Sequence, residues 1–148
     1  MGIVKKVVMN EVWAAALTDG QVFLHLIEDD VEQMRKFPMN KSNETPIVNV
    51  AMAGDFLLLV DAYGKLKYYL IEDNSTICEH KSQNPIVKVF PNQSGTKCVC
   101  IDNTGNGYLF DPVEDSILFI PNFSGTTHSV LWDIDDQNLF VTVDKEKM

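Results

Sequence analysis

An internal repeat of about 40 residues is the feature that most restricts the folds open to this chain. A segment that begins Ile-Val recurs with steps of 44, 39 and about 43 residues, as Ile3–Val7, Ile47–Val50, Ile86–Val89 and, more loosely, Ser129–Trp132. Self-similarity at this period is typical of architectures whose units cannot bury their faces alone and must stack on their neighbours. The chain is therefore expected to be a row of similar units.

Each unit reads as short strands. An apolar run follows each Ile-Val segment, and the runs are Val12–Leu17, Phe56–Val60, Cys98–Ile101 and Leu139–Val143. These runs barely alternate between apolar and polar residues, which predicts strands that are covered on both faces. Glycine-containing hairpin connections lie between successive strands, and we expect Gly64 and Gly95 to need a positive φ there.

A third and a fourth strand complete the first three units. Third strands are expected at Gln21–Leu26 and Lys65–Leu70, where side chains alternate, and Phe110–Asp115 closes the third strand of unit three. Weaker fourth strands are expected at Met34–Phe37, Thr76–His80 and Ser116–Ile120. A helix over Val31–Lys36 competes with the first of these, and we prefer the strand because a helix of two turns is marginal.

Four strands per unit at this period are typical of a β-propeller blade. The sequence predicts an all-β fold, an antiparallel β-propeller fragment of about three and a half four-stranded blades, with units at approximately 1–45, 46–84, 85–127 and 128–148. The pair Trp132-Asp133 lies in the first strand of the last unit. It is therefore not the Trp-Asp pair that closes the third strand of a WD-type blade.

Amino-acid composition and charge restrict the classes of partner and the cellular compartment expected for this chain. The formal net charge of −9 argues against nucleic acid and against an anionic membrane surface, both of which require cationic side chains. No apolar run approaches the roughly 18 residues of a membrane span, so direct membrane insertion is not expected. The start MGIVKKVVMNE does not read as a signal peptide, and three cysteines are an odd number for a disulfide framework. These features favour a cytoplasmic, reducing location.

Three motifs could be interpreted as metal-binding or phosphate-binding sites, and in each case core packing or a turn is the preferred interpretation. Cys98 and Cys100 would share one face of a strand, but no further ligand completes a zinc set, so core packing is preferred. The segment Asp133–Asn138 lacks the glycine and glutamate of a calcium loop and reads as a hairpin turn. Asp102–Gly107 precedes no helix and also reads as a turn. We predict no catalytic, cofactor or metal site.

Acidic pairs recur at equivalent places in the units. The letters LIED occur at Leu26–Asp29 and at Leu70–Asp73, and Glu114-Asp115 holds the corresponding place in the third unit. These pairs are expected to line one rim of the propeller. A solvated edge that deters strand pairing is the preferred interpretation, and an acidic docking rim for a basic partner is the alternative.

An ordered set of short segments resembles the family of intraflagellar transport protein 144, also called WD repeat-containing protein 19, in its second propeller. The resemblance runs over nearly the whole chain and is weakest from Val31 to Thr45. The segments are Leu24–Glu28, Tyr68–Asp73, Phe90-Pro91, Gly95-Thr96, Ile101-Asp102, Gly107-Tyr108, Pro112-Val113, Ile120–Ser124 and Val130–Trp132.

The resemblance implies a non-catalytic scaffold in the IFT-A complex, which serves retrograde transport and cilium assembly, with the other IFT-A subunits as partners and the cilium and ciliary base as location. It carries over no catalytic residue. A vesicle-coat propeller and a ligand-binding or enzymatic propeller remain alternatives. The family also carries a first propeller and a helical solenoid, so this chain is expected to be a fragment whose outer blade faces expose Val12, Ala14, Leu139 and Val141.

Overall fold

Antiparallel pairing connects the strands in chain order, as the repeat predicts. The computed structural model describes residues 3–27, 34–38, 45–121, 123 and 127–144, and within them it contains strands and no helix. The strand bounds are β1 Lys6–Met9, β2 Trp13–Leu17, β3 Val22–Leu26, β4 Arg35–Phe37, β5 Ile47–Ala53, β6 Phe56–Asp61, β7 Lys65–Leu70, β8 Ser75–Lys81, β9 Ile86–Pro91, β10 Cys98–Asp102, β11 Gly107–Asp111, β12 Ser116–Phe119, β13 Thr127–Trp132 and β14 Phe140–Asp144.

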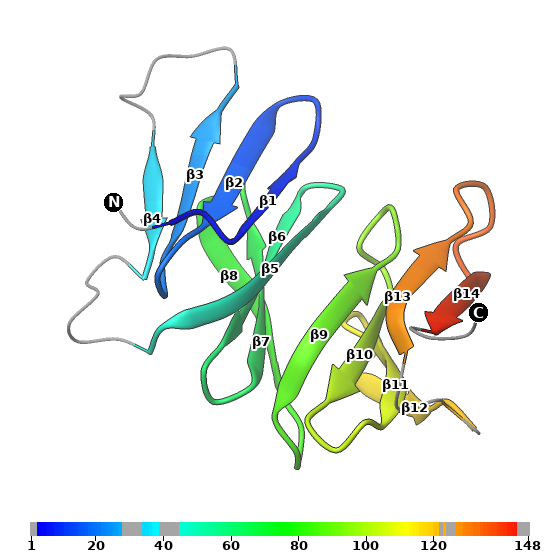
Figure 1. The fold of residues 1–148 in the computed structure, drawn as a ribbon. Helices are drawn as coiled ribbons and strands as arrows, with labels where there is room; N and C mark the ends of the chain where they lie inside the picture. Colours follow the sequence, from blue (N-terminus) through cyan, green and yellow to red (C-terminus); the bar gives the residue numbers. More distant parts are fainter. Residues whose placement is uncertain (1–2, 28–33, 39–44, 122, 124–126, 145–148) are drawn as a thin grey trace.

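The strands form successive sheets that stand side by side (Figure 1). We call the four-stranded sheets blade 1 (β1–β4), blade 2 (β5–β8) and blade 3 (β9–β12), and the two-stranded sheet the β13–β14 hairpin. The first strands of successive sheets contact one another, β1 with β5, β5 with β9 and β9 with β13. First strands at the centre and fourth strands at the rim define a propeller, so the predicted fold class is confirmed.

The first strand of blade 1 begins later than the repeat suggests. In blades 2 and 3 the Ile of the Ile-Val segment is buried, and its N–H donates to a turn glycine of the preceding blade, from Ile47 to Gly20 (2.9 Å) and from Ile86 to Gly64 (3.2 Å). Ile3 has no such partner among the described residues and is 83% exposed. The prediction of a strand from Ile3 was therefore wrong by three residues.

Fourth strands form in all three blades, close to the predicted ranges. The competing helix does not form over its described residues, because Arg35 and Lys36 pair in register with Leu24 and Phe23 of β3. Val31 to Gln33, the start of that helix prediction, lie outside the described residues. Short edge strands are stabilised here by pairing and not by intrinsic propensity.

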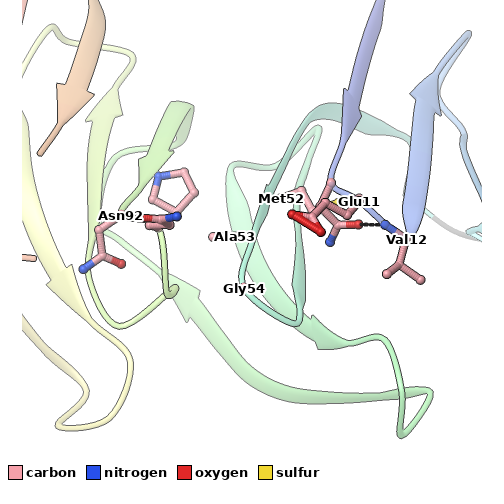
Figure 2. Close-up of a pocket in the computed structure, with 9 residues that line it drawn as sticks. Glu11, Val12, Met52, Ala53, Gly54 and Asn92 are labelled. Carbon is pink, nitrogen blue, oxygen red and sulfur yellow. Dashed lines mark hydrogen bonds between the residues drawn. The ribbon is translucent and has the colours of Figure 1, made fainter. Parts of the chain in front are cut away.

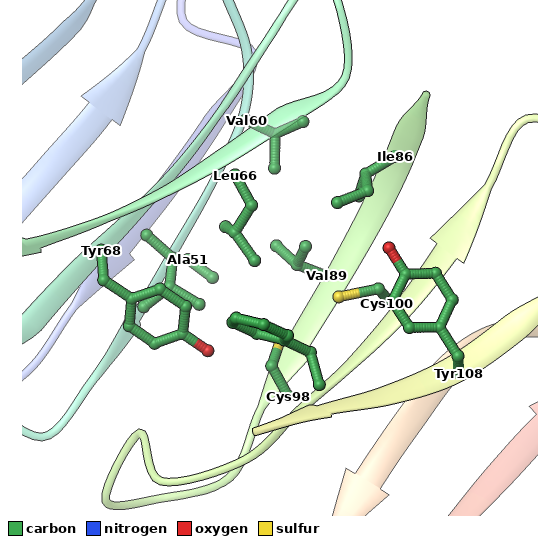
Figure 3. Packing of buried hydrophobic residues seen from close by; sticks show 11 residues of the cluster. Ala51, Val60, Leu66, Tyr68, Ile86, Val89, Cys98, Cys100 and Tyr108 are labelled. Carbon is green, nitrogen blue, oxygen red and sulfur yellow. The ribbon is translucent and has the colours of Figure 1, made fainter. Parts of the chain in front are cut away.

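The hydrophobic core lies between blades, on both faces of blade 2. One cluster joins blades 1 and 2, and it contains Leu57 and Leu59 of β6. The other joins blades 2 and 3, and it contains Leu58 and Val60 of the same strand (Figure 3). Successive side chains of a strand point to opposite faces, so the apolar run of β6 is covered on both sides, as predicted. The same prediction was wrong for the last run, where Leu139 and Val141 are 54% and 57% exposed.

A buried aspartate caps the turn between the second and third strands in blade 2 and in blade 3. The Oδ1 atom of Asp61 accepts hydrogen bonds from the N–H groups of Tyr63 and Lys65, at 2.9 and 3.0 Å. Gly64 follows with φ +83°, and Gly95, in the β9–β10 turn, has φ +82°. The predicted need for positive φ is confirmed at both glycines.

Candidate interaction surface

The acidic pairs of the repeat lie in turns that join third and fourth strands. Glu72 and Asp73 occupy the turn between β7 and β8, and Glu114 and Asp115 occupy the turn between β11 and β12, all four exposed. Glu28 to Asp30, the first copy, lie outside the described residues. The two described pairs thus hold equivalent places in neighbouring blades, as predicted.

Turns between first and second strands open onto the same end of each blade. The N–H of Ile27 donates to the carbonyl of Val12 (2.8 Å), and the N–H of Ile71 donates to the carbonyl of Asp55 (3.1 Å). Both kinds of turn therefore build one surface, which we call the turn face. Its exposed acidic side chains are Glu11, Asp55, Glu72, Asp73, Glu114, Asp115, Asp133, Asp135 and Asp136.

Basic side chains beside the turn face are already engaged. Lys97 lies 3.9 Å from the carboxylate of Asp111. Arg35 donates to the Tyr69 hydroxyl (2.7 Å) and the Ile71 carbonyl (2.8 Å), and its guanidinium lies 5.1 Å from the centre of the Trp13 ring. Carboxylates gathered on one surface, with Lys97 and Arg35 the basic side chains beside them in the described part of the chain, create a negative potential that attracts basic partners.

A cleft of about 430 Å³ crosses the turn face near the propeller centre. Figure 2 shows Glu11 and Val12 of blade 1, Met52 to Gly54 of blade 2 and Asn92 of blade 3 around it. Its lining is apolar and neutral-polar apart from Glu11. The turns that shape it are fixed internally, since Asn10 Oδ1 accepts from the N–H groups of Val12 and Trp13. A cleft of this kind suits an inserted side chain of a partner.

Amide and hydroxyl groups hold the β13–β14 hairpin to blade 3 on the turn face. Asn92 Nδ2 donates to the Gln137 carbonyl (3.2 Å), and Ser94 and Thr96 donate to Gln137 Oε1. Farther along, Trp132 Nε1 donates to the carbonyl of Phe90 (2.8 Å). Trp132 lies in the first strand of its sheet, as predicted, whereas Asp133 follows that strand. The hydrogen bond from Trp132 connects the hairpin to blade 3.

The aspartate-rich segment predicted to be a hairpin turn is one. Asp133 Oδ2 accepts from the N–H groups of Asp135 (3.1 Å) and Asp136 (2.7 Å), and Asp136 Oδ1 accepts from Asn138 N–H (2.9 Å). The segment 102–107 is likewise a turn. Burial opposes the charge of Asp102, but hydrogen bonds from Thr104 and Asn106 outweigh it and lower the pKa of Asp102.

The two thiols predicted to pack in the core do so. Cys98 and Cys100 are fully buried between blades 2 and 3, and burial raises the pKa of Cys100 well above its usual range. His80 joins the same two blades, since its Nε2 lies 3.0 Å from the Tyr108 hydroxyl and its ring stacks 4.2 Å from that of Phe110. Burial lowers the pKa of His80, and Asp115 opposes that shift. These groups hold blades together.

The inner strands carry a polar chain across three blades. Lys6 Nζ donates to Asn49 Oδ1 (2.9 Å), and Asn49 Nδ2 donates to the Val87 carbonyl (3.1 Å). Among the described residues no group of three or more His, Cys, Asp or Glu side chains is placed to hold a metal ion. The described residues contain no helix with the length and apolarity that a bilayer crossing requires.

Comparison with known proteins places the whole chain in one family. A family model described as the WDR19 second β-propeller matches residues 1–148. Human WD repeat-containing protein 19 is 32% identical over 156 residues, and this match covers 100% of the chain. The chain belongs to the WDR19 second β-propeller family. The resemblance predicted from the ordered segments is thus confirmed.

Two further WDR19 relatives also match the whole chain. Mouse WD repeat-containing protein 19 is 31% identical, and Caenorhabditis elegans WD repeat-containing protein dyf-2 is 20% identical, each match covering 100% of the chain. The chain spans 12% of the length of the human and mouse WDR19 proteins and 11% of dyf-2. It therefore corresponds to one part of each relative, a WD-repeat propeller.

Solved structures support the fold. Human WBSCR16 superposes with a TM-score of 0.60 at 19% identity, covering 81% of this chain and 38% of that one. The β-propeller domain of Myceliophteria thermophila Cps50 (Swd1) superposes with a TM-score of 0.55 at 19% identity, covering 69% and 35%. At this identity the likeness concerns architecture alone.

Sequence reasoning found part of the turn face. It identified the acidic pairs at Glu72-Asp73 and Glu114-Asp115 because they repeat. It missed Glu11 and Asp55, and it weighed Asp133–Asn138 as a calcium loop or a hairpin turn and not as part of an acidic surface, because these residues belong to a different set of turns. The signal that could have joined them is topological: in an up-and-down blade, the first and third turns lie at the same end.

Proposed function

We propose that this WDR19-family chain is a non-catalytic protein-interaction scaffold within a subunit of intraflagellar transport complex A, acting in retrograde transport and cilium assembly. Its partners are the other subunits of that complex, and its location is the cytoplasm, the ciliary base and the cilium. Neither nucleic acid nor the bilayer core is a partner, in keeping with the net charge of −9. Family membership over the whole chain supports this proposal.

The turn face is the observation that carries the docking role. It displays exposed carboxylates from every sheet, while the neighbouring Lys97 is paired with Asp111 and Arg35 hydrogen-bonds to the Tyr69 hydroxyl and the Ile71 carbonyl. Apolar side chains stand among the acids, including Val12, Val113 and Ile134, all exposed. Mixed acidic and apolar surface fits a partner that presents basic and apolar side chains, with charge steering the encounter.

Charge reversal tests this role in ciliated cells that lack the endogenous protein. The double variant Glu72→Lys, Asp73→Lys changes the turn face, and both residues are exposed in a turn. The matched control is Asp19→Lys, at the opposite end of blade 1, where the side chain is 69% exposed. We expect the turn-face variant to lose recovery with the other IFT-A subunits and to shorten cilia, while the control retains both.

Two results contradict the proposal. Complex recovery and cilia equal to those of the parent protein in the turn-face variant would show that another surface docks the partners. Normal cilia in cells without the protein, together with its recovery on non-ciliary vesicle coats, would favour a coat scaffold instead. The melting temperature of both variants is measured in parallel, so that a loss through misfolding is recognised.

A further inference from the structure

We propose that the outer edge of β12 is a strand-addition site for a partner protein. The added segment is extended and apolar, and it carries basic residues near its own C-terminal end. This surface lies at the rim of blade 3, and it shares only Glu114 and Asp115 with the turn face described above. Extended peptides join exposed sheet edges through main-chain hydrogen bonds, with alternate side chains setting specificity.

The backbone of β12 offers groups for such pairing. Within the described residues β12 is the edge of its sheet and pairs only with β11. Ile120 N–H donates to the Gly107 carbonyl (3.0 Å), so Leu118, two residues earlier, also directs its backbone groups to β11. Because the direction alternates along an antiparallel strand, Ile117 and Phe119 turn their N–H and C=O groups outward.

The side chains of β12 are apolar and exposed. Ile117, Leu118 and Phe119 are 42%, 68% and 56% exposed. In the register, Ile117 lies opposite Phe110 and Phe119 opposite Tyr108, whose ring centre is 5.5 Å from that of Phe119. Ile117 and Phe119 therefore share the face that meets blade 2, and they stay exposed beside it. An added strand would cover them.

Among the described residues, the rim strands β4 and β8 carry protective features that β12 lacks. Natural sheets guard their edges with short strands and charged side chains. The rim strand β4 has three residues and includes exposed Lys36, and β8 carries exposed Glu79 and Lys81. The segment Ser116–Phe119 holds no charged residue. An unguarded apolar edge at the rim, beside the guarded rim strands β4 and β8, indicates an interaction site.

Charge selects the occupant. Glu114 and Asp115 are exposed immediately before β12, and an antiparallel added strand brings its C-terminal end beside them. A second copy of β12 offers no Lys or Arg to meet these carboxylates. A partner segment with basic residues at that end complements both the apolar edge and the acidic flank.

Synthetic peptides test the site with the full chain. The probe is a ten-residue fluorescent peptide of alternating Val and Thr that ends in Lys-Arg, and its controls carry Lys-Arg at the N-terminus or Glu-Glu at the C-terminus. Anisotropy should show the tightest binding for the first peptide. Ile117→Lys should weaken it by about tenfold or more, a difference of roughly 1.4 kcal/mol or greater.

A matched variant and amide exchange distinguish loss of the β12 edge from the general effect of an added positive charge. Tyr63→Lys adds the same charge in the β6–β7 turn, where the residue is 69% exposed and lies away from Glu114 and Asp115, and it should change affinity by less than about threefold. Amide exchange should slow at Ile117 and Phe119 on peptide addition, because an added strand takes up their outward N–H groups. If Ile117→Lys lowers the melting temperature, Leu118→Lys, on the opposite face, replaces it.

Four outcomes overturn the proposal. Equal affinity in the edge variants would place the peptide elsewhere, and absence of binding by all three peptides would refute strand addition. Self-association that Ile117→Lys abolishes and Leu139→Lys leaves intact would make a second copy the occupant. Slowed exchange confined to β8 would move the site to blade 2.

Discussion

Replacing Gly64 with valine should destabilise the chain more than any Cys→Ser change. A Cβ atom at this position would stand 2.3 Å from Pro85 Cα, 2.4 Å from Pro85 Cβ and 2.6 Å from Ile86 N. The backbone there also has φ +83°, which a β-branched residue adopts only with strain. The substitution therefore distorts the connection between blades 2 and 3.

The magnitude follows from two contributions. Left-handed backbone costs a non-glycine residue about 1–2 kcal/mol, and forcing atoms into an occupied space costs about 1–3 kcal/mol. We expect a loss of about 3 kcal/mol or more, which lowers the melting temperature by roughly 6–12 °C in a domain of this size. Cys98→Ser places a hydroxyl in the core and should cost about 1–2 kcal/mol.

Urea titrations followed by fluorescence and circular dichroism measure both variants under the same conditions. Gly64→Ala serves as an intermediate, since it adds the Cβ without branching. Gly95→Val should behave like Gly64→Val, because its Cβ would meet Phe56 Cδ2 at 2.9 Å with φ +82°. A cysteine variant that loses as much stability as Gly64→Val would refute the assignment of these turns as the tightest points of the fold.

Three further predictions concern metal, pH and association. A chelator should leave the melting temperature unchanged, because Cys98 and Cys100 are fully buried and make up an incomplete ligand set; a fall would reveal a bound metal. Burial lowers the pKa of His80 below 6.5, so stability should fall as pH drops below that value, and His80→Gln should remove the fall. Apolar blade surface such as Leu139 and Val141, which are 54% and 57% exposed, should make the 148-residue chain associate. Burial of about 500 Å² of such surface favours association by on the order of 10 kcal/mol before entropic costs. A clean monomer in light scattering would contradict this prediction.

The sequence predicted the sheets well because each strand has local signals. The Ile-Val segments, the apolar runs and the hairpin glycines recur at one period, and their consistency outweighs weak single signals. The same reasoning placed the first strand too early. It aligned Ile3 with Ile47 and Ile86, whereas only the last two make a backbone hydrogen bond to a preceding blade.

The turn face could be predicted only in part for a topological reason. Residues such as Glu11, Asp55 and Asp133 share no motif with the LIED pairs and lie far apart along the chain. They meet because antiparallel strands return the first and third turns of every blade to the same end. The edge of β12 was missed for another reason, since a sequence pattern predicts a strand without showing which side of it stays unpaired.

The apolar composition of β6 in blade 2 affects how the register of its pairing with neighbouring strands is set. A slip of one residue normally carries apolar side chains to the wrong face and is rejected on that ground. In β6 the residues from Leu57 to Val60 are apolar on both faces, so a slipped strand would still bury apolar side chains. The alignment must instead be set at the ends, where Asp61 caps its turn and Gly64 meets Pro85. In this strand apolar burial supplies the stability, and the turn residues decide which alignment is native.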